Sequence, residues 1–220
     1  MIEEKIRFIN QRITAACGRV GIDPCGVTLL AVTKTVNAAD IDAAIRSGVR
    51  HVGESRVQEA LAKLPGLKLD GVKKHLIGHL QTNKAKKAVE FFDVIQSLDR
   101  LELASEIDRH AASLGKVQEC FLEIKVSPED TKFGLPAGET DSFLEAAGQF
   151  KHINISGLMT MAPYFEDPWL ARPFFARARE VFEGLKARGL KTLSMGMSGD
   201  FEVAIEEGSN MVRIGTAIFK

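Results

Sequence analysis

Apolar runs short enough for β-strands alternate with segments of helical periodicity along the whole chain. The runs predict eight strands, at residues 27–34, 50–54, 74–77, 92–97, 118–126, 154–159, 192–195 and 211–215. Between them apolar residues recur every three or four positions, as on the buried face of a helix. Two such faces are Val57, Ala60, Leu61 and Leu64, and Phe174, Ala178, Val181 and Leu185. Ser55 and Gln58, three residues apart, have the pattern of a capping box at the start of a helix.

Eight strands alternating with helices in 220 residues favour an α/β fold, a single (β/α)8 TIM-type barrel. Several strands are apolar on both faces, which suits a barrel covered by helices. An open doubly wound sheet remains the alternative, although neither GxGxxG nor GxxxxGK[ST] occurs at a strand-to-helix junction. No linker divides the chain, so we expect one domain over residues 1–220. We expect an extra N-terminal helix over residues 2–20 to cover the last helix position, because the chain ends soon after the eighth strand.

Charge and composition narrow the class of protein. Lys plus Arg and Asp plus Glu number 29 each, so no overall field draws the chain to nucleic acid or an acidic membrane. No apolar run approaches 18 residues and the N-terminus lacks the pattern of a signal peptide, so we expect a cytoplasmic protein. Cys17, Cys25 and Cys120 form no metal-binding or disulfide pattern, and we expect inert packing residues and no metal. No heptad seam is present, and we expect a monomer.

The first predicted strand is apolar and ends in Lys34. At the mouth of a barrel a lysine loses hydration, which lowers its pKa and leaves a neutral amine able to attack an aldehyde. The alternative is a lysine that extends its ammonium group into solvent at a strand end.

The ends of the last two strands are rich in small residues. Ser194-Met195-Gly196-Met197-Ser198 and Gly215-Thr216 follow strands seven and eight, where barrels commonly bind phosphate through backbone N–H groups. Taken singly, Ser198 also suits a helix N-cap and Gly215 a turn. In a closed barrel the first and eighth strands are neighbours, so Lys34 and this phosphate site would face one cavity. Pyridoxal 5′-phosphate (PLP) has both an aldehyde and a phosphate.

Six segments, in this order, resemble the pyridoxal-phosphate homeostasis protein family: Ala31–Thr35, Gly53–Glu59, His75–Lys84, Gly157–Met159, Ser194–Ser198 and Val212–Phe219. The resemblance implies a barrel like the N-terminal domain of alanine racemase, with Lys34 carrying PLP as an aldimine. It also implies that Ser194, Met195, Gly196, Ser198, Gly215 and Thr216 hold the phosphate and that Arg213 faces the pyridine nitrogen. The family usually has asparagine where this chain has Ser55, which leaves a contact between Ser55 and the ring in doubt.

Three functions follow from these residues. The first is a protein with little or no catalysis of its own that buffers PLP or delivers it to client enzymes, because the guanidinium of Arg213 cannot protonate the ring nitrogen. The second is an amino-acid racemase in which His79, His51 or Tyr164 serves the face opposite Lys34. The third is a barrel that binds a sugar phosphate without covalent attachment.

Weaker candidates complete the set. Lys84, Lys86 and Lys87 form a small basic group that we interpret as a solvated helix face, with contact to a phosphate or a client enzyme as the alternative. Residues 130–134 have the composition of a plain loop or a lid, and Met159 and Met161 are either cavity-lining or core residues.

Overall fold

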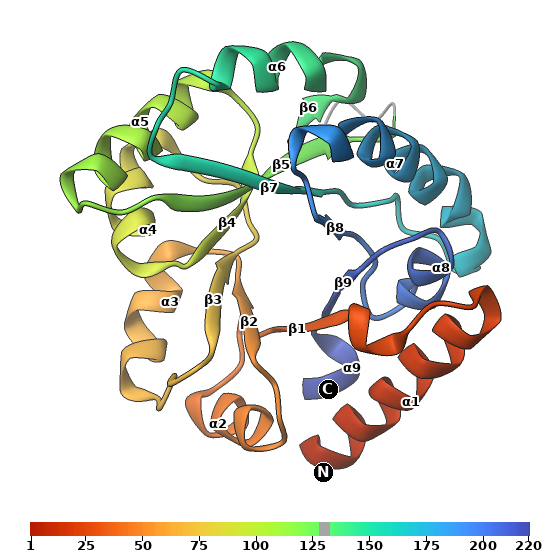
Figure 1. Cartoon of the computed structure of the whole chain (residues 1–220). Helices are drawn as coiled ribbons and strands as arrows, with labels where there is room; N and C mark the ends of the chain where they lie inside the picture. The colour runs from red at the N-terminus through yellow and green to blue at the C-terminus, as the bar shows by residue number, and fades with distance from the viewer. Residues whose placement is uncertain (128–132) are drawn as a thin grey trace.

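The computed structural model describes residues 1–127 and 133–220. Parallel strands form a ring with helices around its outside, seen along the barrel in Figure 1. The order around the ring is β4-β3-β2-β1-β9-β8-β7-β5, and pairing between β4 and β5 closes it. The predicted TIM-type barrel is therefore confirmed, and the open-sheet alternative is wrong.

All eight predicted strands are present with ends shifted by no more than two residues. The ring consists of β1 Thr28–Val32, β2 His51–Glu54, β3 Lys73–Leu76, β4 Val94–Leu98, β5 Gln118–Lys125, β7 Ile153–Met159, β8 Thr192–Ser194 and β9 Met211–Ile214. A two-residue strand that the sequence did not predict, β6 Leu135–Pro136, pairs with the end of β5.

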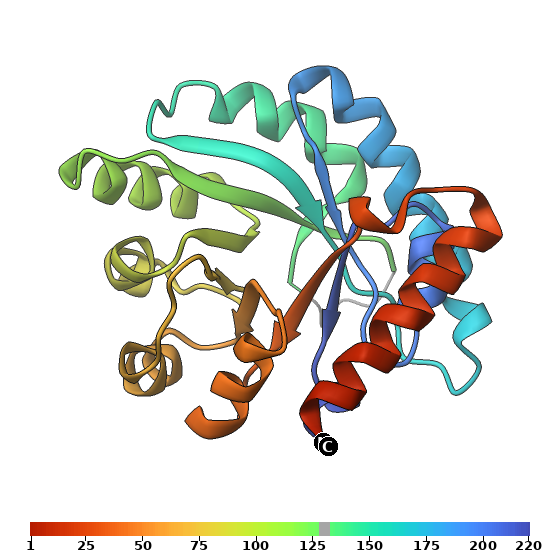
Figure 2. The same cartoon turned by 60° about the horizontal axis from the view of Figure 1, so that its bottom comes forward.

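The helices lie outside the ring. They are α1 Ile2–Val20, α2 Ala38–Arg46, α3 Val57–Lys63, α4 Ala85–Phe91, α5 Leu101–Ser113, α6 Thr140–Ala147, α7 Arg172–Leu185, α8 Phe201–Glu206 and α9 Thr216–Phe219. As predicted, α1 covers the gap at the end of the barrel, between α8 and α2, with Ile6, Ile9 and Ile13 buried (Figure 1). The two ends of the chain lie side by side there (Figure 2), and the ammonium of Lys5 donates a hydrogen bond of 2.9 Å to the carbonyl oxygen of Lys220.

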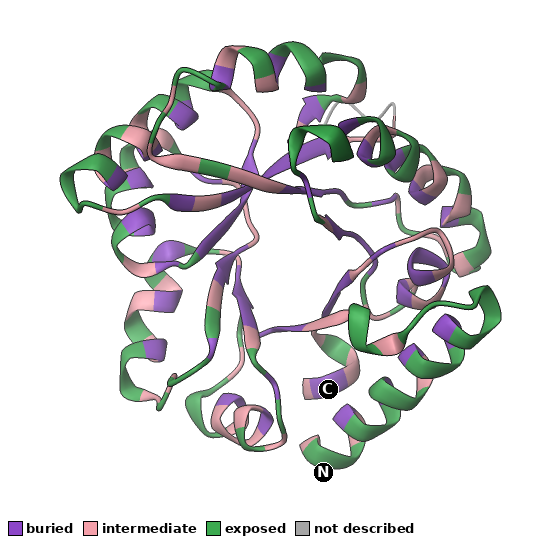
Figure 3. Cartoon of the chain, in the orientation of Figure 1, coloured by how far each residue is buried: buried purple, intermediate pink, exposed green. Residues whose placement is uncertain are grey.

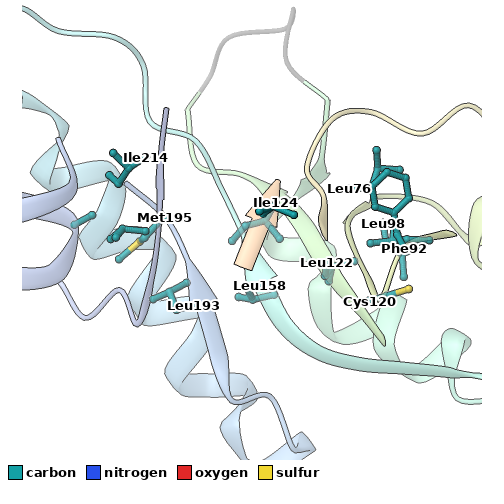
Figure 4. Close-up of a cluster of buried hydrophobic side chains, with 14 of the residues drawn as sticks. Leu76, Phe92, Leu98, Cys120, Leu122, Ile124, Leu158, Leu193, Met195 and Ile214 are labelled. Carbon is teal, nitrogen blue, oxygen red and sulfur yellow. The ribbon is translucent and has the colours of Figure 1, made fainter. Parts of the chain in front are cut away.

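Two apolar regions hold the barrel together. Between the ring and the helices lies a large core, visible as the purple inner faces of the helices in Figure 3. Figure 4 shows part of it, where Leu158, Leu193 and Met195 meet helix-facing side chains of the neighbouring strands. A smaller cluster fills the barrel interior and consists of Leu30, Val32, Val94, Phe121, Met159 and Met211.

Three local predictions were wrong. Helix α3 begins at Val57 with Arg56 as its N-cap and without a capping hydrogen bond from a side chain, so Ser55 forms no capping box. Ser55 precedes the N-cap, and its backbone packs against Gly78, where a Cβ atom would lie 2.2 Å from the Ser55 carbonyl oxygen. On α7 the buried residues include Phe175 and Phe182, whereas Phe174 and Val181 are only partly buried. Apolar side chains form two adjacent rows on this helix, and the sequence does not show which row faces the core. Cys25 is exposed, so only Cys17 and Cys120 are packing residues.

The packing of α1 can be measured through Ile9, which is 1% exposed. We expect Ile9→Ala to lower the free energy of unfolding by about 2–4 kcal/mol, because it leaves a cavity between α1 and the barrel. Phe8→Ala is the matched control, since Phe8 is 58% exposed on the same turn, and we expect it to cost less than about 1 kcal/mol. Urea denaturation of both variants checks this, and equal losses would show that α1 does not seal the barrel.

Candidate functional site

The closure of the ring brings the first and last strands together. In the pairing of β1 with β9, Ala31 lies opposite Ile214. Lys34 and Gly215 follow these residues, so both stand at the carboxyl edge of the barrel although 180 positions separate them in the chain. A cavity of about 280 Å³ lies between the two strand ends, and Lys34, Gly215 and Thr216 are among the residues that line it.

Lys34 is exposed at the edge of this cavity. The expectation that its amino group is desolvated is therefore wrong for the protein without a ligand. The reason is local, because the chain leaves β1 at Val32 and Thr35 has a positive φ of 62°, which turns the loop outward.

A buried brace that sequence reasoning missed supports the loop of Lys34. The ammonium of Lys63 donates 2.6 Å to the carbonyl oxygen of Thr33 and lies 2.8 Å from the carboxylate of Glu54. The Thr33 hydroxyl in turn donates to the same carboxylate oxygen. Glu54 is fully buried, so this ion pair is shielded from solvent and ties α3, β1 and β2 together directly beneath Lys34. Glu54, an acidic residue at the end of the second strand, was the signal in the sequence for this buried ion pair.

The loops after β8 and β9 are joined by Ser198. Its hydroxyl oxygen accepts hydrogen bonds from the backbone N–H groups of Gly215, at 3.2 Å, and Ala217, at 3.3 Å. Ser198 is thus not the N-cap of α8, a position that Asp200 occupies. Gly196 has φ of 90° and its α-carbon packs so closely on α8 that a Cβ atom would lie 2.5 Å from that of Ala204. Two N–H groups of one loop therefore converge on a single oxygen.

Met195, also assigned to the phosphate site from the sequence, has no group left for a ligand. Its side chain is fully buried in the core between barrel and helices (Figure 4). Its N–H donates to the carbonyl oxygen of Met211 at 3.1 Å, and its own carbonyl oxygen accepts from the Ser209 hydroxyl at 2.7 Å. We therefore correct the predicted set by leaving this residue out.

Arg213 lies inside the barrel and is 3% exposed. Its Nη1 donates to the carbonyl oxygen and to the hydroxyl of Ser194, at 2.7 and 2.9 Å, and its Nη2 donates to the carbonyl oxygen of Thr160 at 2.8 Å. Burial lowers the pKa of this guanidinium to about 10, opposed by the charges of Glu123 and Asp200. The group is held in one orientation, with its Nε–H and one Nη2–H outside these three bonds.

Glu123 is a second buried charged residue that the sequence analysis did not single out. It is 4% exposed at the carboxyl half of β5, and among the described residues its Oε2 has no hydrogen-bond partner. Burial raises its pKa to about 7, and the charge of Asp99 adds to this, while Arg213 and Lys125 act in the opposite direction. A glutamate within the apolar sequence Phe121-Leu122-Glu123-Ile124 was the signal for it.

The candidates for a second catalytic group are dispersed. His51 is the first residue of β2 and so lies at the end of the barrel opposite Lys34. Tyr164 is 89% exposed, as an ordinary loop residue would be. His79 follows β3, with its ring stacked on Phe133 and its Nδ1 3.5 Å from Asp99. His79 and Tyr164 both follow strands and so share the carboxyl end of the barrel with Lys34, but the Tyr164 side chain extends into solvent.

The weaker candidates also have defined places. Lys86 and Lys87 are exposed on α4, as a solvated helix face requires, and Lys84 is half-buried just before it. Met159 is buried in the barrel interior and Met161 is 36% exposed. Residues 130–132 of the predicted loop or lid lie outside the described residues.

Comparison with known proteins agrees with this fold and arrangement. The family model for the N-terminal domain of alanine racemase matches residues 12–220. Crystal structures with the same fold include an unknown protein from Bifidobacterium adolescentis, with TM-score 0.93 and 36% identity over 99% of this chain and 94% of that one. PipY of Synechococcus elongatus with PLP bound has TM-score 0.86 and 36% identity over 100% of both chains. Fold and strand-end residues thus define a barrel protein of the alanine racemase N-terminal type.

Two relatives make the assignment narrower. The pyridoxal phosphate homeostasis protein of Aquifex aeolicus is 40% identical, over 98% of this chain and 96% of its own length. That of Escherichia coli K12 is 39% identical, over 99% and 95%. The chain belongs to the pyridoxal phosphate homeostasis protein family.

In the part of the chain that the structure describes, no helix has the length and apolar character needed to cross a membrane.

The raised pKa of Glu123 predicts a pH dependence of stability. Because the folded state binds this proton more tightly than the unfolded chain, the free energy of unfolding falls as pH rises from about 4.5 through about 7. Glutamine cannot ionise, so we expect Glu123→Gln to be more stable than wild type by roughly 1–3 kcal/mol at pH 8 and no more stable at pH 4.5. Denaturant melts at both pH values measure this.

Glu145→Gln is the matched control, because Glu145 is exposed on α6. We expect it to follow the wild type at both pH values. If Glu123→Gln also had the stability of the wild type at both pH values, the pKa of Glu123 would not be raised in the folded protein.

Proposed function

We propose that this protein binds pyridoxal 5′-phosphate through Lys34 and holds it for other proteins, with little or no catalysis of its own. The observation that carries the proposal is the shared cavity: Lys34 lines it together with Gly215 and Thr216. The family relationship supports it, since the structure of a relative has PLP bound and other relatives are named for PLP homeostasis.

The residues present fit this cofactor. The Lys34 amine would hold the cofactor by bonding to its aldehyde carbon with loss of water, and its exposure in the free protein leaves it accessible to that aldehyde. The N–H groups of Gly215 and Ala217 converge on one oxygen, that of the Ser198 hydroxyl. A phosphate oxygen can accept hydrogen bonds from two N–H groups arranged in this way. Thr216 is exposed at the same cavity and adds a hydroxyl. Gly215 keeps the wall open, because a Cβ atom there would lie 3.3 Å from Val32 Cβ.

Arg213 and Ser194 are buried inside the barrel and do not line this cavity, and we assign them to the proposed site because they lie at the ends of the strands that precede the Gly215 and Ser198 loops. When bound, pyridoxal phosphate supplies an electron sink whose strength depends on protonation of its ring nitrogen. A guanidinium donates hydrogen bonds and has no acceptor, so Arg213 can only donate to an unprotonated nitrogen. This arrangement disfavours transamination, and a racemase would additionally need an acid or base on the face of the ring opposite Lys34. Both points support storage and delivery. Client enzymes would receive the cofactor when an incoming amine displaces Lys34.

Covalent binding is tested by Lys34→Ala. We expect the wild type reconstituted with PLP to show the visible absorption band of a lysine-bound aldehyde, and the variant to lose it. After borohydride reduction, mass spectrometry should find the added mass on the peptide of Lys34. Lys87→Ala, an exposed lysine on α4, is the control and should keep the band. A wild type that stays colourless after PLP is added would exclude the proposal, and bound PLP that borohydride does not trap would favour the non-covalent phosphate site.

The absence of strong catalysis is tested by exchange at the α-carbon. We expect reconstituted protein incubated with L-alanine in deuterated water to exchange the α-proton no faster than free PLP at the same concentration, because Tyr164 and His51 lie away from the cavity. NMR spectroscopy of the alanine measures this. Exchange at enzymatic rates would identify a racemase, with His79 as the first residue to replace.

A further inference from the structure

A continuous chain of hydrogen bonds crosses the barrel interior from the proposed cofactor site to the opposite end. The Nη1 of Arg213 donates to the Ser194 hydroxyl at 2.9 Å, and this hydroxyl donates to Oε1 of Gln96 at 2.8 Å. The Nε2 of Gln96 lies 2.9 Å from Nδ1 of His75, and Nε2 of His75 lies 2.9 Å from Nδ1 of His51. We call these five residues the relay: Arg213, Ser194, Gln96, His75 and His51.

The direction of the bonds in the relay is set at Ser194. Its hydroxyl oxygen accepts from Arg213, which can only donate, and its own proton goes to the Gln96 carbonyl oxygen. The amide nitrogen of Gln96 then faces His75 and donates to Nδ1. His75 must therefore carry its proton on Nε2 and donate it to Nδ1 of His51, which leaves the His51 proton on Nε2. Both histidines are neutral in this arrangement.

The surroundings of the relay agree with neutral histidines. His75 is 1% exposed, and burial, with His51 and Lys73 adding to it, holds its pKa well below the usual range. Burial also lowers the pKa of His51, where Lys73 acts in the same direction and Glu119 opposes it. These two charges lie 3.5 Å apart on β3 and β5, and Arg50 is the neighbouring charge on the chain. At the other end, Glu123 and Asp200 act on Arg213.

The relay ends at a solvent-accessible place. His51 is half-buried and lines a surface hollow of about 370 Å³ at the amino end of the barrel, together with Asn10, Thr28 and Ser47. A proton can reach the relay there without passing through the cofactor cavity. Of the two histidines, His51 is thus the one that titrates from solvent.

An added proton would reverse the relay in a defined way. With His51 doubly protonated, its Nδ1 holds the proton that Nε2 of His75 gives up, and water must supply the new proton at Nδ1 of His75, because the amide of Gln96 passes no proton on. Gln96 must turn its amide so that Oε1 accepts from His75 and Nε2 donates to Ser194. The Ser194 hydroxyl then accepts from both Gln96 and Arg213, and its own proton points away from Gln96. One proton enters and the number on every other group is unchanged.

We propose that Gln96 and His75 are positioning residues of the cofactor site, and that the relay transmits the protonation of His51 to the hydroxyl of Ser194, which contacts Arg213. The proposal rests on the proposed function, because Arg213 and Ser194 matter to a ligand only if PLP binds beside them. The relay itself exists in the protein without cofactor and can be tested there.

The first experiment uses the cofactor-free protein and histidine side-chain 15N NMR spectroscopy. At pH 8 we expect His75 and His51 both to carry their proton on Nε2. Gln96→Glu should change this for His75, because a carboxylate cannot donate to Nδ1 and a proton must move there. A wild-type His75 with its proton on Nδ1 would overturn the relay, whether or not the protein binds PLP.

The second experiment follows the visible band of reconstituted protein between pH 8 and pH 5. His51→Gln is the informative variant, because its carbonyl oxygen can still accept from His75 but it cannot titrate. We expect the band of this variant at pH 8 to match that of the wild type. On acidification to pH 5, we expect the PLP affinity of the wild type to fall by about tenfold more than that of the variant, because one hydrogen bond to a charged group is worth about that factor. Gln96→Leu should shift the band already at pH 8.

Controls separate the relay from general effects of pH and folding. His152→Gln replaces a histidine that is 39% exposed and outside the relay, and it should behave as wild type throughout. Identical pH profiles for His51→Gln and the wild type would show that protonation of His51 does not affect the cofactor site, and would overturn this part of the proposal. A wild type that binds no PLP while its histidines keep the expected tautomers would overturn the proposed function instead and leave the relay standing.

Discussion

The pairing of β1 with β9 is the constraint on which the rest of the molecule depends. It joins the first strand to the last, with Thr28 opposite Met211 at one end and Ala31 opposite Ile214 at the other. Because all strands of the ring run parallel, every loop that follows a strand emerges at one end of the barrel. Lys34 and the Gly215 loop become neighbours for this reason alone. The N-terminal helix α1 protects the same junction from outside, since it packs on α8, α9 and α2.

Inside the ring, polar groups are arranged around one permanent charge. Arg213 is buried, and each of its neighbours is oriented by the fact that a guanidinium can only donate. In a low-dielectric interior such bonds are strong and an unpaired partner is costly. Glu123 is one of the residues with a buried oxygen that has no partner among the described residues, and its raised pKa lowers that cost because the carboxyl keeps its proton near neutral pH.

Lys34 and Arg213 both lie where the first and last strands are joined, but Lys34 is exposed and Arg213 is buried. Lys34 is exposed on a loop that is braced from below by Lys63, Glu54 and Thr33, so its backbone is held while its amine is free to react. Arg213 is enclosed and held by three hydrogen bonds. A site with one reactive and one immobile cation suits a protein that binds an anionic aldehyde reversibly.

The eight strands, the barrel and the position of Lys34 beside the last strand could be predicted from the sequence, because apolar periodicity is local and a closed ring leaves one neighbour for the first strand. The family resemblance came from short motifs that are equally local. Tertiary structure alone decided which predicted residues have free groups. Met195 is fully engaged by β9 and Ser209, Lys34 is exposed, and Ser198 bridges two loops instead of capping a helix. It alone also decided that His51, His75 and Gln96 meet Ser194, since their spacing along the chain carries no sign of contact across a barrel. Burial, hydrogen-bond partners and charge are properties of neighbours in space, and the closed ring brings together residues that the chain keeps far apart.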